Sequence, residues 1–147
     1  MEKTLSIFTD GGASGNPGPA AIGFVVKDDQ GKVLIEMGKY IGKATNNVAE
    51  YSAVIEALKW IRDNLQFTLS TGRQAVYNLQ FFLDSKLVVN QLNGLFKIKN
   101  SNLRNLIIEV RTLEKEIGGN NFYHFIPREK NRHADFLVHS SLSKIGP

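Results

Sequence analysis

The spacing of apolar residues changes at Thr45, and this change limits the fold more than any other feature of the chain. Before Thr45, segments 4–10 and 20–42 carry short apolar runs typical of strands. The strand predicted at 4–10 has apolar residues on both faces, which indicates a central strand. The second segment contains DDQG, which predicts a hairpin turn with Gly31 at positive φ. After Thr45 the apolar residues follow helical spacing, as Tyr51, Val54, Ile55, Leu58, Ile61 and Leu65.

The rest of the chain alternates in the same way. Residues 75–84 predict an apolar strand, 85–94 a short helix closed by Gly94, and 97–119 a longer helix with a glycine stop. Residues 66–74 predict a loop or short hairpin extension, 121–127 a last strand, and 131–145 a last helix. The core face of the helix predicted at 97–119 is expected to carry Leu103, Leu106, Ile107, Val110 and Leu113. The core face of the helix predicted at 131–145 is expected to carry Ala134, Leu137, Val138, Ser141, Leu142 and Ile145.

The order βββαβααβα predicts one α/β domain over residues 1–147, with a five-stranded mixed sheet flanked by helices. The chain has no cysteine, which excludes disulfides and thiolate zinc sites. No long apolar segment opens the chain, so a cytoplasmic protein without a membrane span is expected. The net charge of +4 permits a polyanionic partner without identifying one.

Four carboxylates lie at the borders of these elements. Asp10 and Asp84 each stand where an apolar strand is predicted to end, and side chains at adjacent strand ends of an α/β sheet converge. Glu50 and Asp135 lie in the first turns of two predicted helices. Clustered carboxylates repel one another and need a cation, and oxygen ligands suit Mg²⁺ or Mn²⁺. The pattern is therefore compatible with a divalent-metal site.

Each of these carboxylates also has an ordinary structural interpretation. Asp10 precedes two glycines and fits a turn, and Asp84 fits the N-cap of the helix that follows it. Asn47 and Glu50 fit a capping box, and Asp135 fits a solvated residue favoured by the helix dipole. The residues alone leave both interpretations open.

Four segments of the chain resemble ribonuclease H, type 1: FTDGGASGNPGPAAIGFVV, TNNVAEYSAVIEAL, DSKLVVNQLNG and REKNRHADFLVHSSL. They occur in the family's order and cover most of the chain. The stretch KIKNSNLRNL is similar to the compact subgroup that lacks the basic handle, and no extra hybrid-binding domain is expected before Met1. The resemblance implies a metal-dependent endonuclease that cleaves the RNA strand of RNA/DNA hybrids to 5′-phosphate and 3′-hydroxyl ends.

The resemblance also implies roles for individual residues. Asp10, Glu50, Asp84 and Asp135 match the family's four metal-binding carboxylates, which implies two Mg²⁺ ions, with Mn²⁺ as a substitute. The glycines are expected to let the RNA backbone approach closely. Contacts with nucleic acid are expected at Gly11, Asn16, Thr45, Asn46, Asn47, Lys86, Arg128 and Asn131.

The chain departs from the family at two places. Lys86 stands where the family often has glutamine, and no histidine is evident on the loop before the last helix. His124 is expected in the last strand, His133 at the start of the last helix and His139 facing solvent, none with an assigned role. Arg128, just after the last strand, is the candidate for contact with the scissile phosphate.

Two other functions compete with hybrid cleavage. A related nuclease could also act on double-stranded RNA, because both duplexes present 2′-hydroxyls. A non-catalytic hybrid-binding module is the second alternative, although the presence of all four carboxylates argues against it. The expected partner is an RNA/DNA hybrid, with double-stranded RNA as a further candidate, and the expected state is a monomer.

Overall fold

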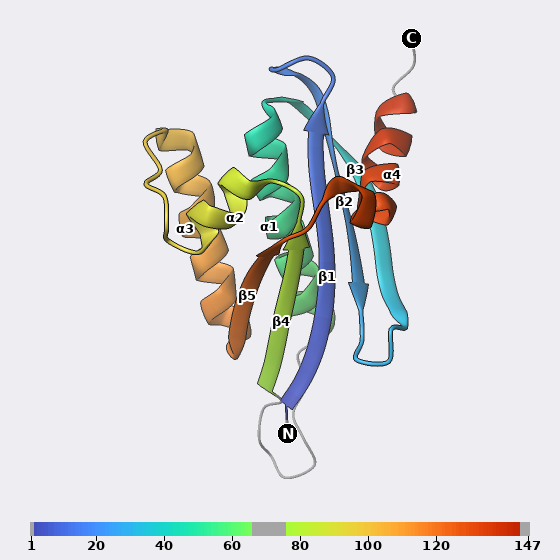
Figure 1. The fold of residues 1–147 in the computed structure, drawn as a ribbon, viewed down its shortest axis with the longest axis vertical. Coiled ribbons are helices and arrows are strands. Elements are labelled where there is room, and N and C mark those ends of the chain that lie inside the picture. Colours follow the sequence, from blue (N-terminus) through green and yellow to red (C-terminus); the bar gives the residue numbers. More distant parts are fainter. Residues whose placement is uncertain (1, 66–75, 145–147) are drawn as a thin grey trace.

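The computed structural model describes residues 2–65 and 76–144, and there it confirms the expected order of elements (Figure 1). A short 3-10 helix, η1 (Arg128–Lys130), precedes the last helix. The strands are β1 (Glu2–Ala13), β2 (Gly18–Lys27), β3 (Val33–Ala44), β4 (Val76–Leu83) and β5 (Asn120–Phe125). The helices are α1 (Asn46–Asn64), α2 (Lys86–Leu92), α3 (Ser101–Ile117) and α4 (Arg132–Ser143).

The five strands form one mixed sheet in the order β3-β2-β1-β4-β5. The first three strands are antiparallel, with Gly31 at φ 79° in the predicted hairpin, whereas β1, β4 and β5 run parallel. β1 is therefore central, as its two apolar faces predicted. Parallel neighbours also bring the ends of β1 and β4 to the same end of the sheet.

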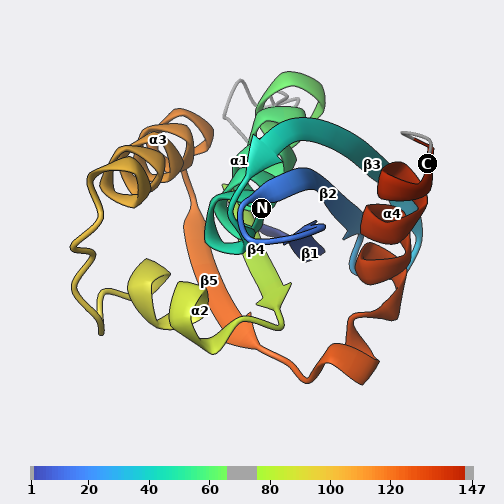
Figure 2. The same cartoon turned by 90° about the horizontal axis from the view of Figure 1, so that it is seen from above.

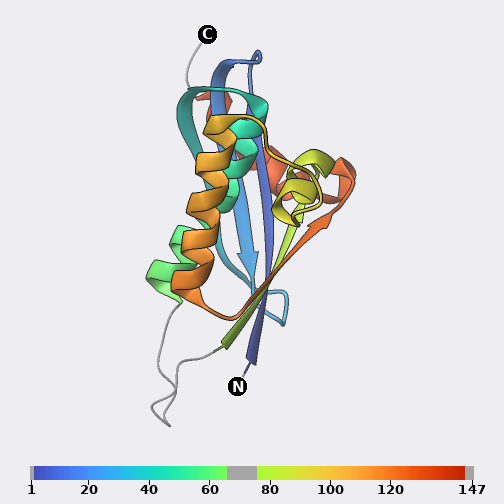
Figure 3. The same ribbon diagram turned by 90° about the vertical axis from the view of Figure 1, so that its left-hand side faces the viewer.

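Helices cover the two faces unequally. α1 and α3 lie side by side on one face and enclose the main core (Figure 3). α4 packs on the opposite face against β2 and β3 (Figure 2). β2 shows this division directly, because Ile22 and Phe24 point into the core while Gly23 meets the backbone of α4. Among the described residues, no helix is long and apolar enough to cross a membrane.

The end of β1 differs from the prediction. The strand was expected to stop at Asp10, but it continues to Ala13, because β2 remains paired with it through Gly11↔Ile22 and Ala13↔Ala20. Its parallel pairing with β4 ends earlier, at Phe8↔Phe82. Asp10 thus lies inside a strand rather than in a turn. It stands where β1 continues beyond the part that is paired with β4.

The structure decides against the capping alternatives that the sequence left open for Asn47, Glu50 and Asp84. Thr45, not Asn47, caps α1 by accepting a hydrogen bond from the amide of Val48. Ser85, not Asp84, caps α2 in the same way. In both cases a hydroxyl within two residues of the candidate caps the helix, so Glu50 and Asp84 are not needed for capping.

The longer predicted segments include loop residues at their ends. α3 begins at Ser101, because Asn100 accepts hydrogen bonds from the amides of Asn102 and Leu103, so residues 97–100 precede the helix. α4 ends at Ser143. The predicted loop at 66–74 and the predicted core position Ile145 lie outside the described residues.

Candidate active site

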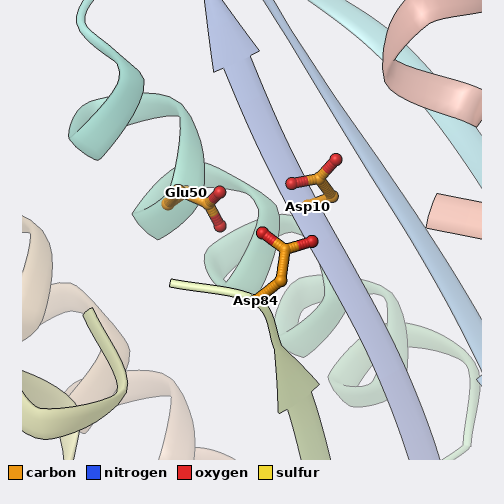
Figure 4. A group of neighbouring side chains, drawn as sticks. All are labelled: Asp10, Glu50 and Asp84. Atoms are coloured by element: carbon orange, nitrogen blue, oxygen red, sulfur yellow. The ribbon is translucent and has the colours of Figure 1, made fainter. Parts of the chain in front are cut away.

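Three carboxylates from separate parts of the chain meet where β1 passes beyond β4 (Figure 4). Asp10 comes from β1, Asp84 directly follows β4, and Glu50 lies in the first turns of α1. One oxygen atom from each carboxylate lies within 4.8 Å of the corresponding atoms of the other two. Continuing the β1–β4 register by two residues would place Asp10 opposite Asp84, which explains why these strand ends converge.

A close approach of β1 to α1 brings Glu50 to Asp10. A Cβ atom on Gly11 would lie 2.2 Å from the carbonyl carbon of Ala49 and 2.5 Å from the amide nitrogen of Glu50. Only glycine therefore fits between the strand and the helix. Gly11 was expected to leave room for RNA, but the space of its missing side chain is filled by the backbone of α1.

Asp135 approaches the cluster from α4. It is not one of the three carboxylates that converge within 4.8 Å, but it lines the same cavity of about 430 Å³. The structure therefore brings all four predicted carboxylates to one cavity. The other lining residues are Gly11, Gly12, Ala13, Asn46, Asn47, Ser85, Arg128, Val138, His139 and Leu142.

Burial and mutual repulsion make these carboxylates reluctant to ionise together. Burial, followed by the negative charge of Asp84, raises the pKa of Asp10 from 3.8 to about 7. Burial and the charges of Asp10 and Asp84 raise the pKa of Glu50 well above its ordinary value. A cation between the groups would reverse this effect, because a nearby positive charge favours the ionised form.

The donor set fits a hard divalent cation. Glu50 Oε2 is buried and has no hydrogen-bond partner, so this carboxylate keeps a buried acceptor without a donor. The converging ligand atoms are all carboxylate oxygens, the type that Mg²⁺ and Mn²⁺ prefer over soft metals. The structure therefore shows an acidic cluster suited to such ions.

Asn131 has a structural role next to this cluster. Its side-chain amide donates to Asp84 Oδ2 at 3.0 Å and to the Thr9 carbonyl at 2.9 Å. Only 1% of its surface is exposed. The sequence placed Asn131 among the nucleic-acid contacts, but its amide is committed to β1 and Asp84. It orients a carboxylate rather than presenting a free donor to a duplex.

Arg128 and His139 stand at the mouth of the cavity. Arg128 Nη2 lies 3.8 Å from Asp84 Oδ1, and its side chain is 70% exposed, so it can reach a phosphate outside the cluster. His139 Nε2 lies 3.3 Å from Asp135 Oδ1. His139 is exposed as expected, yet it lines the cavity, and no role was predicted for it from the sequence. The helical spacing i, i+4 from Asp135 was the available signal.

The predicted nucleic-acid residues near α1 form a second, neighbouring cavity of about 400 Å³. The Asn46 amide donates to Asn16 Oδ1, and the Ala13 amide donates to Asn46 Oδ1, so these side chains also fix the loop after β1. Asn100 and Asn102 from the start of α3 line the same cavity and were missed. The complete lining is Asn16, Thr45, Asn46, Asn47, Val48, Asn100, Asn102 and Leu103.

Lys86 lies apart from these cavities. Its ammonium sits 5.1 Å from the ring centroid of Phe125, and it lines neither the carboxylate cavity nor the asparagine cavity. The aromatic ring of β5 explains why a lysine is accommodated at the start of α2. Its predicted contact with a phosphate stays a prediction.

Comparisons with known proteins agree with the geometry. The family described as "Reverse transcriptase-like" matches residues 8–141. The chain is 36% identical to ribonuclease HI of Halobacterium salinarum over 92% of its own length and 62% of that protein. It is 39% identical to the bifunctional protein Rv2228c of Mycobacterium tuberculosis, again over 92% of its own length, but spans only 35% of that relative.

Solved structures extend the similarity to three dimensions. LC11-RNase H1, crystallised in complex with an RNA/DNA hybrid, is 38% identical with a TM-score of 0.87, over 96% of this chain and 98% of that chain. The N-terminal RNase H domain of Rv2228c from Mycobacterium tuberculosis is 34% identical with a TM-score of 0.83, over 95% and 99% of the two chains. The five-stranded sheet and its helices are therefore those of a known fold.

Proposed function

The chain belongs to the type 1 ribonuclease H family, and we propose that it is a metal-dependent endonuclease that cleaves the RNA strand of RNA/DNA hybrids. The observation that carries this proposal is the convergence of Asp10, Glu50 and Asp84 within 4.8 Å, with Asp135 on the same cavity. The similarity to a protein crystallised with a hybrid supports the choice of substrate.

In this proposal the four carboxylates would hold two Mg²⁺ ions, for which Mn²⁺ could substitute. When bound, such ions supply an activated water nucleophile and stabilise the charge that develops on the departing 3′ oxygen. Asp10 would be a central ligand of these ions, because it lies with Glu50 and Asp84 within 4.8 Å and shares a cavity with Asp135. Asn131 holds Asp84 in the orientation that this arrangement needs.

The chain's other residues bind and orient the hybrid. The asparagine cavity beside α1 presents amide and hydroxyl groups that can donate to and accept from 2′-hydroxyls and backbone oxygens across a minor groove. Arg128 contacts the scissile phosphate from the mouth of the carboxylate cavity. A guanidinium stays protonated at working pH, so Arg128 binds charge and does not act as a base.

One experiment tests substrate and strand choice together. A hybrid labelled on each strand is incubated with the protein in Mg²⁺ and in EDTA, beside double-stranded RNA and all-DNA duplexes of the same sequence. We expect cleavage of the RNA strand of the hybrid, only with metal, leaving 5′-phosphate ends. Tight hybrid binding without cleavage in Mg²⁺ or Mn²⁺ would favour the non-catalytic module, and equal cleavage of double-stranded RNA would favour the broader nuclease.

A further inference from the structure

Part of the sheet is left uncovered on the face opposite α1 and α3. On that face α4 packs against β2, β3 and part of β1. Figure 1 views the molecule from this side, and no helix lies in front of β4. The side chains that project here from β1, β4 and β5 are therefore available for contact with another molecule.

An aromatic ladder crosses this uncovered area. Phe8, Phe82 and His124 are register partners on β1, β4 and β5. Their rings stack with centroid separations of 5.0 Å and 5.2 Å. The ammonium of Lys27 lies 5.2 Å from the centroid of Phe8, at the other end of the ladder from His124. Because β5 is the last strand of the described sheet, the ladder ends at the exposed ring of His124.

A small cavity of about 160 Å³ lies beside the ladder, between β1, β2 and the start of α4. Two lysines line it, Lys27 from β2 and Lys130 from η1. Neither has a carboxylate partner among the described residues. The carboxylate of Glu36 is bonded to His133, another residue of this lining, with a separation of 2.6 Å. Two ammonium groups are thus left for an anion from outside the protein.

The cavity adjoins the candidate active site. Asn131 lines it and donates to Asp84 Oδ2, so a single buried side chain separates the lysines from the carboxylates. Phe8 and Phe82 lie two residues before Asp10 and Asp84 on the same strands. A chain of phosphates bound near the carboxylates can therefore continue onto the uncovered face.

We propose that this cavity and the aromatic ladder bind single-stranded nucleic acid, with backbone phosphate on Lys27 and Lys130 and a base stacked on His124. Aromatic rings beside positive charge are the features by which proteins hold single strands without reading their sequence. The occupant that fits is the unpaired continuation of a strand whose paired part lies at the carboxylate cavity. This binding does not require the cleavage activity proposed above.

Fluorescence anisotropy with a labelled oligodeoxythymidine of about ten nucleotides, in EDTA and at several salt concentrations, tests the phosphate contacts. We expect measurable binding whose salt dependence weakens in the Lys27→Ala/Lys130→Ala variant. Loss of two phosphate contacts should lower the slope of log K against log salt by about 1.4. Lys115→Ala, on the exposed side of α3 across the sheet, is the control and should change the affinity little.

A second pair of variants tests the stacking contact. His124→Ala should weaken oligonucleotide binding by about tenfold, whereas His124→Phe should retain it, because stacking needs a ring and not an imidazole. Absence of binding at low salt would overturn the proposal, as would equal losses in Lys115→Ala and the double lysine variant. Binding that depends on Asn47 or Arg128 but not on Lys27, Lys130 or His124 would place the strand in the hybrid site and also overturn it.

Cleavage of a blunt hybrid by the same variants separates the two proposals. Lys27→Ala/Lys130→Ala should cut a blunt hybrid at close to the wild-type rate while binding the single strand more weakly. If the wild-type protein binds the oligonucleotide as expected but cuts no hybrid, the proposed activity fails and the single-strand site stands.

Discussion

Gly11 shows how one residue sets the geometry of the site. Its missing side chain lets β1 approach α1 closely enough for Asp10 and Glu50 to lie in the same carboxylate cluster. We expect Gly11→Ala to destabilise the fold by about 1–3 kcal/mol, as overpacking does, and to abolish most cleavage by displacing Glu50. Thermal unfolding and single-turnover cleavage measure the two effects.

Gly12→Ala is the matched control for this prediction. A Cβ at Gly12 would meet Val138 Cγ1 at 3.5 Å, an ordinary contact, so this variant should fold with near wild-type stability. Equal unfolding temperatures for Gly11→Ala and Gly12→Ala would show that the close approach of β1 to α1 is not required.

The raised pKa of Asp10 predicts an effect of pH on the metal-free protein. Between about pH 4 and pH 7 the unfolded chain releases this proton while the folded chain keeps it. The contribution of Asp10 to stability should therefore fall as pH rises through this window and change little above it. Asp10→Asn lacks this penalty and should be more stable than wild type above pH 7, by at most about 4 kcal/mol.

Denaturant unfolding of both proteins in EDTA at a series of pH values measures this difference. The gap between them should grow from pH 4 to pH 7. A gap that stays constant with pH would mean that Asp10 ionises normally in the folded protein.

Arg128 and two histidines should respond differently to substitution. His124 stacks on Phe82 and His133 is bonded to Glu36, and neither lines the carboxylate cavity. His124→Ala and His133→Ala should each lose less than about tenfold in cleavage rate, below the usual contribution of a general acid or base. Arg128→Ala should lose more, since its guanidinium reaches the cavity mouth.

Steady-state and single-turnover cleavage of one blunt hybrid by the three folded variants tests this order. A loss of about a hundredfold or more in the rate of either histidine variant, with Arg128→Ala unaffected, would show that a histidine and not Arg128 contributes to cleavage.

At the scale of elements, hydrophobic spacing predicted the order of strands and helices but not where each one ends. β1 extends to Ala13 because β2 is long enough to pair with it, and this tertiary partner leaves no signal in residues 10–13 themselves. Thr45 and Ser85 form the caps for which Asn47 and Asp84 were alternatives, since polar residues close together in sequence compete for one capping position. Such choices depend on how the whole element docks.

The site residues that lie at strand ends and helix starts could be predicted from the sequence. Residues that reach the site only because two helices pack together were harder to predict. Asp10, Glu50, Asp84 and Asp135 were found from their positions and from the family resemblance. Their cavity also includes His139, whose helical spacing from Asp135 was visible but not decisive. Asn100 and Asn102 were missed because their approach to Asn16 depends on how α3 packs beside α1.

Asn131 joins three elements, because it starts α4 and bonds the carbonyl of Thr9 in β1 and the carboxylate after β4. Asn131→Ala should cost about 1–3 kcal/mol of stability, since it leaves a buried carbonyl without its donor, and should lower the cleavage rate by releasing Asp84. The exposed pair formed by Asn120 with Asn78 provides a control.

Asn120→Ala removes an asparagine hydrogen bond at an exposed position and should change stability by less than about 0.5 kcal/mol. Chemical denaturation and cleavage assays compare the two variants. If Asn131→Ala kept full stability and full activity, the hydrogen bond between Asn131 and Asp84 would be required for neither.

At the scale of the whole molecule, one end of the sheet carries every group that the proposed reaction needs. The carboxylate cavity and the asparagine cavity share Asn46 and Asn47, so a duplex that contacts one is close to the other. α1 supplies Glu50 to the first cavity and Thr45 caps it beside the second. The proposed substrate recognition and the proposed metal binding would therefore both depend on the start of the same helix.

The most direct test of this account is single-turnover cleavage of an RNA/DNA hybrid as Mg²⁺ is titrated, by wild type and by Asp10→Asn. We expect the wild-type rate to rise from zero to a plateau, with cuts only in the RNA strand. Asp10→Asn should stay folded and lose on the order of a hundredfold or more at every Mg²⁺ concentration. Wild-type cleavage in EDTA, or Asp10→Asn with more than about a tenth of the wild-type rate, would contradict the proposal that the carboxylate cluster is a metal-dependent catalytic centre.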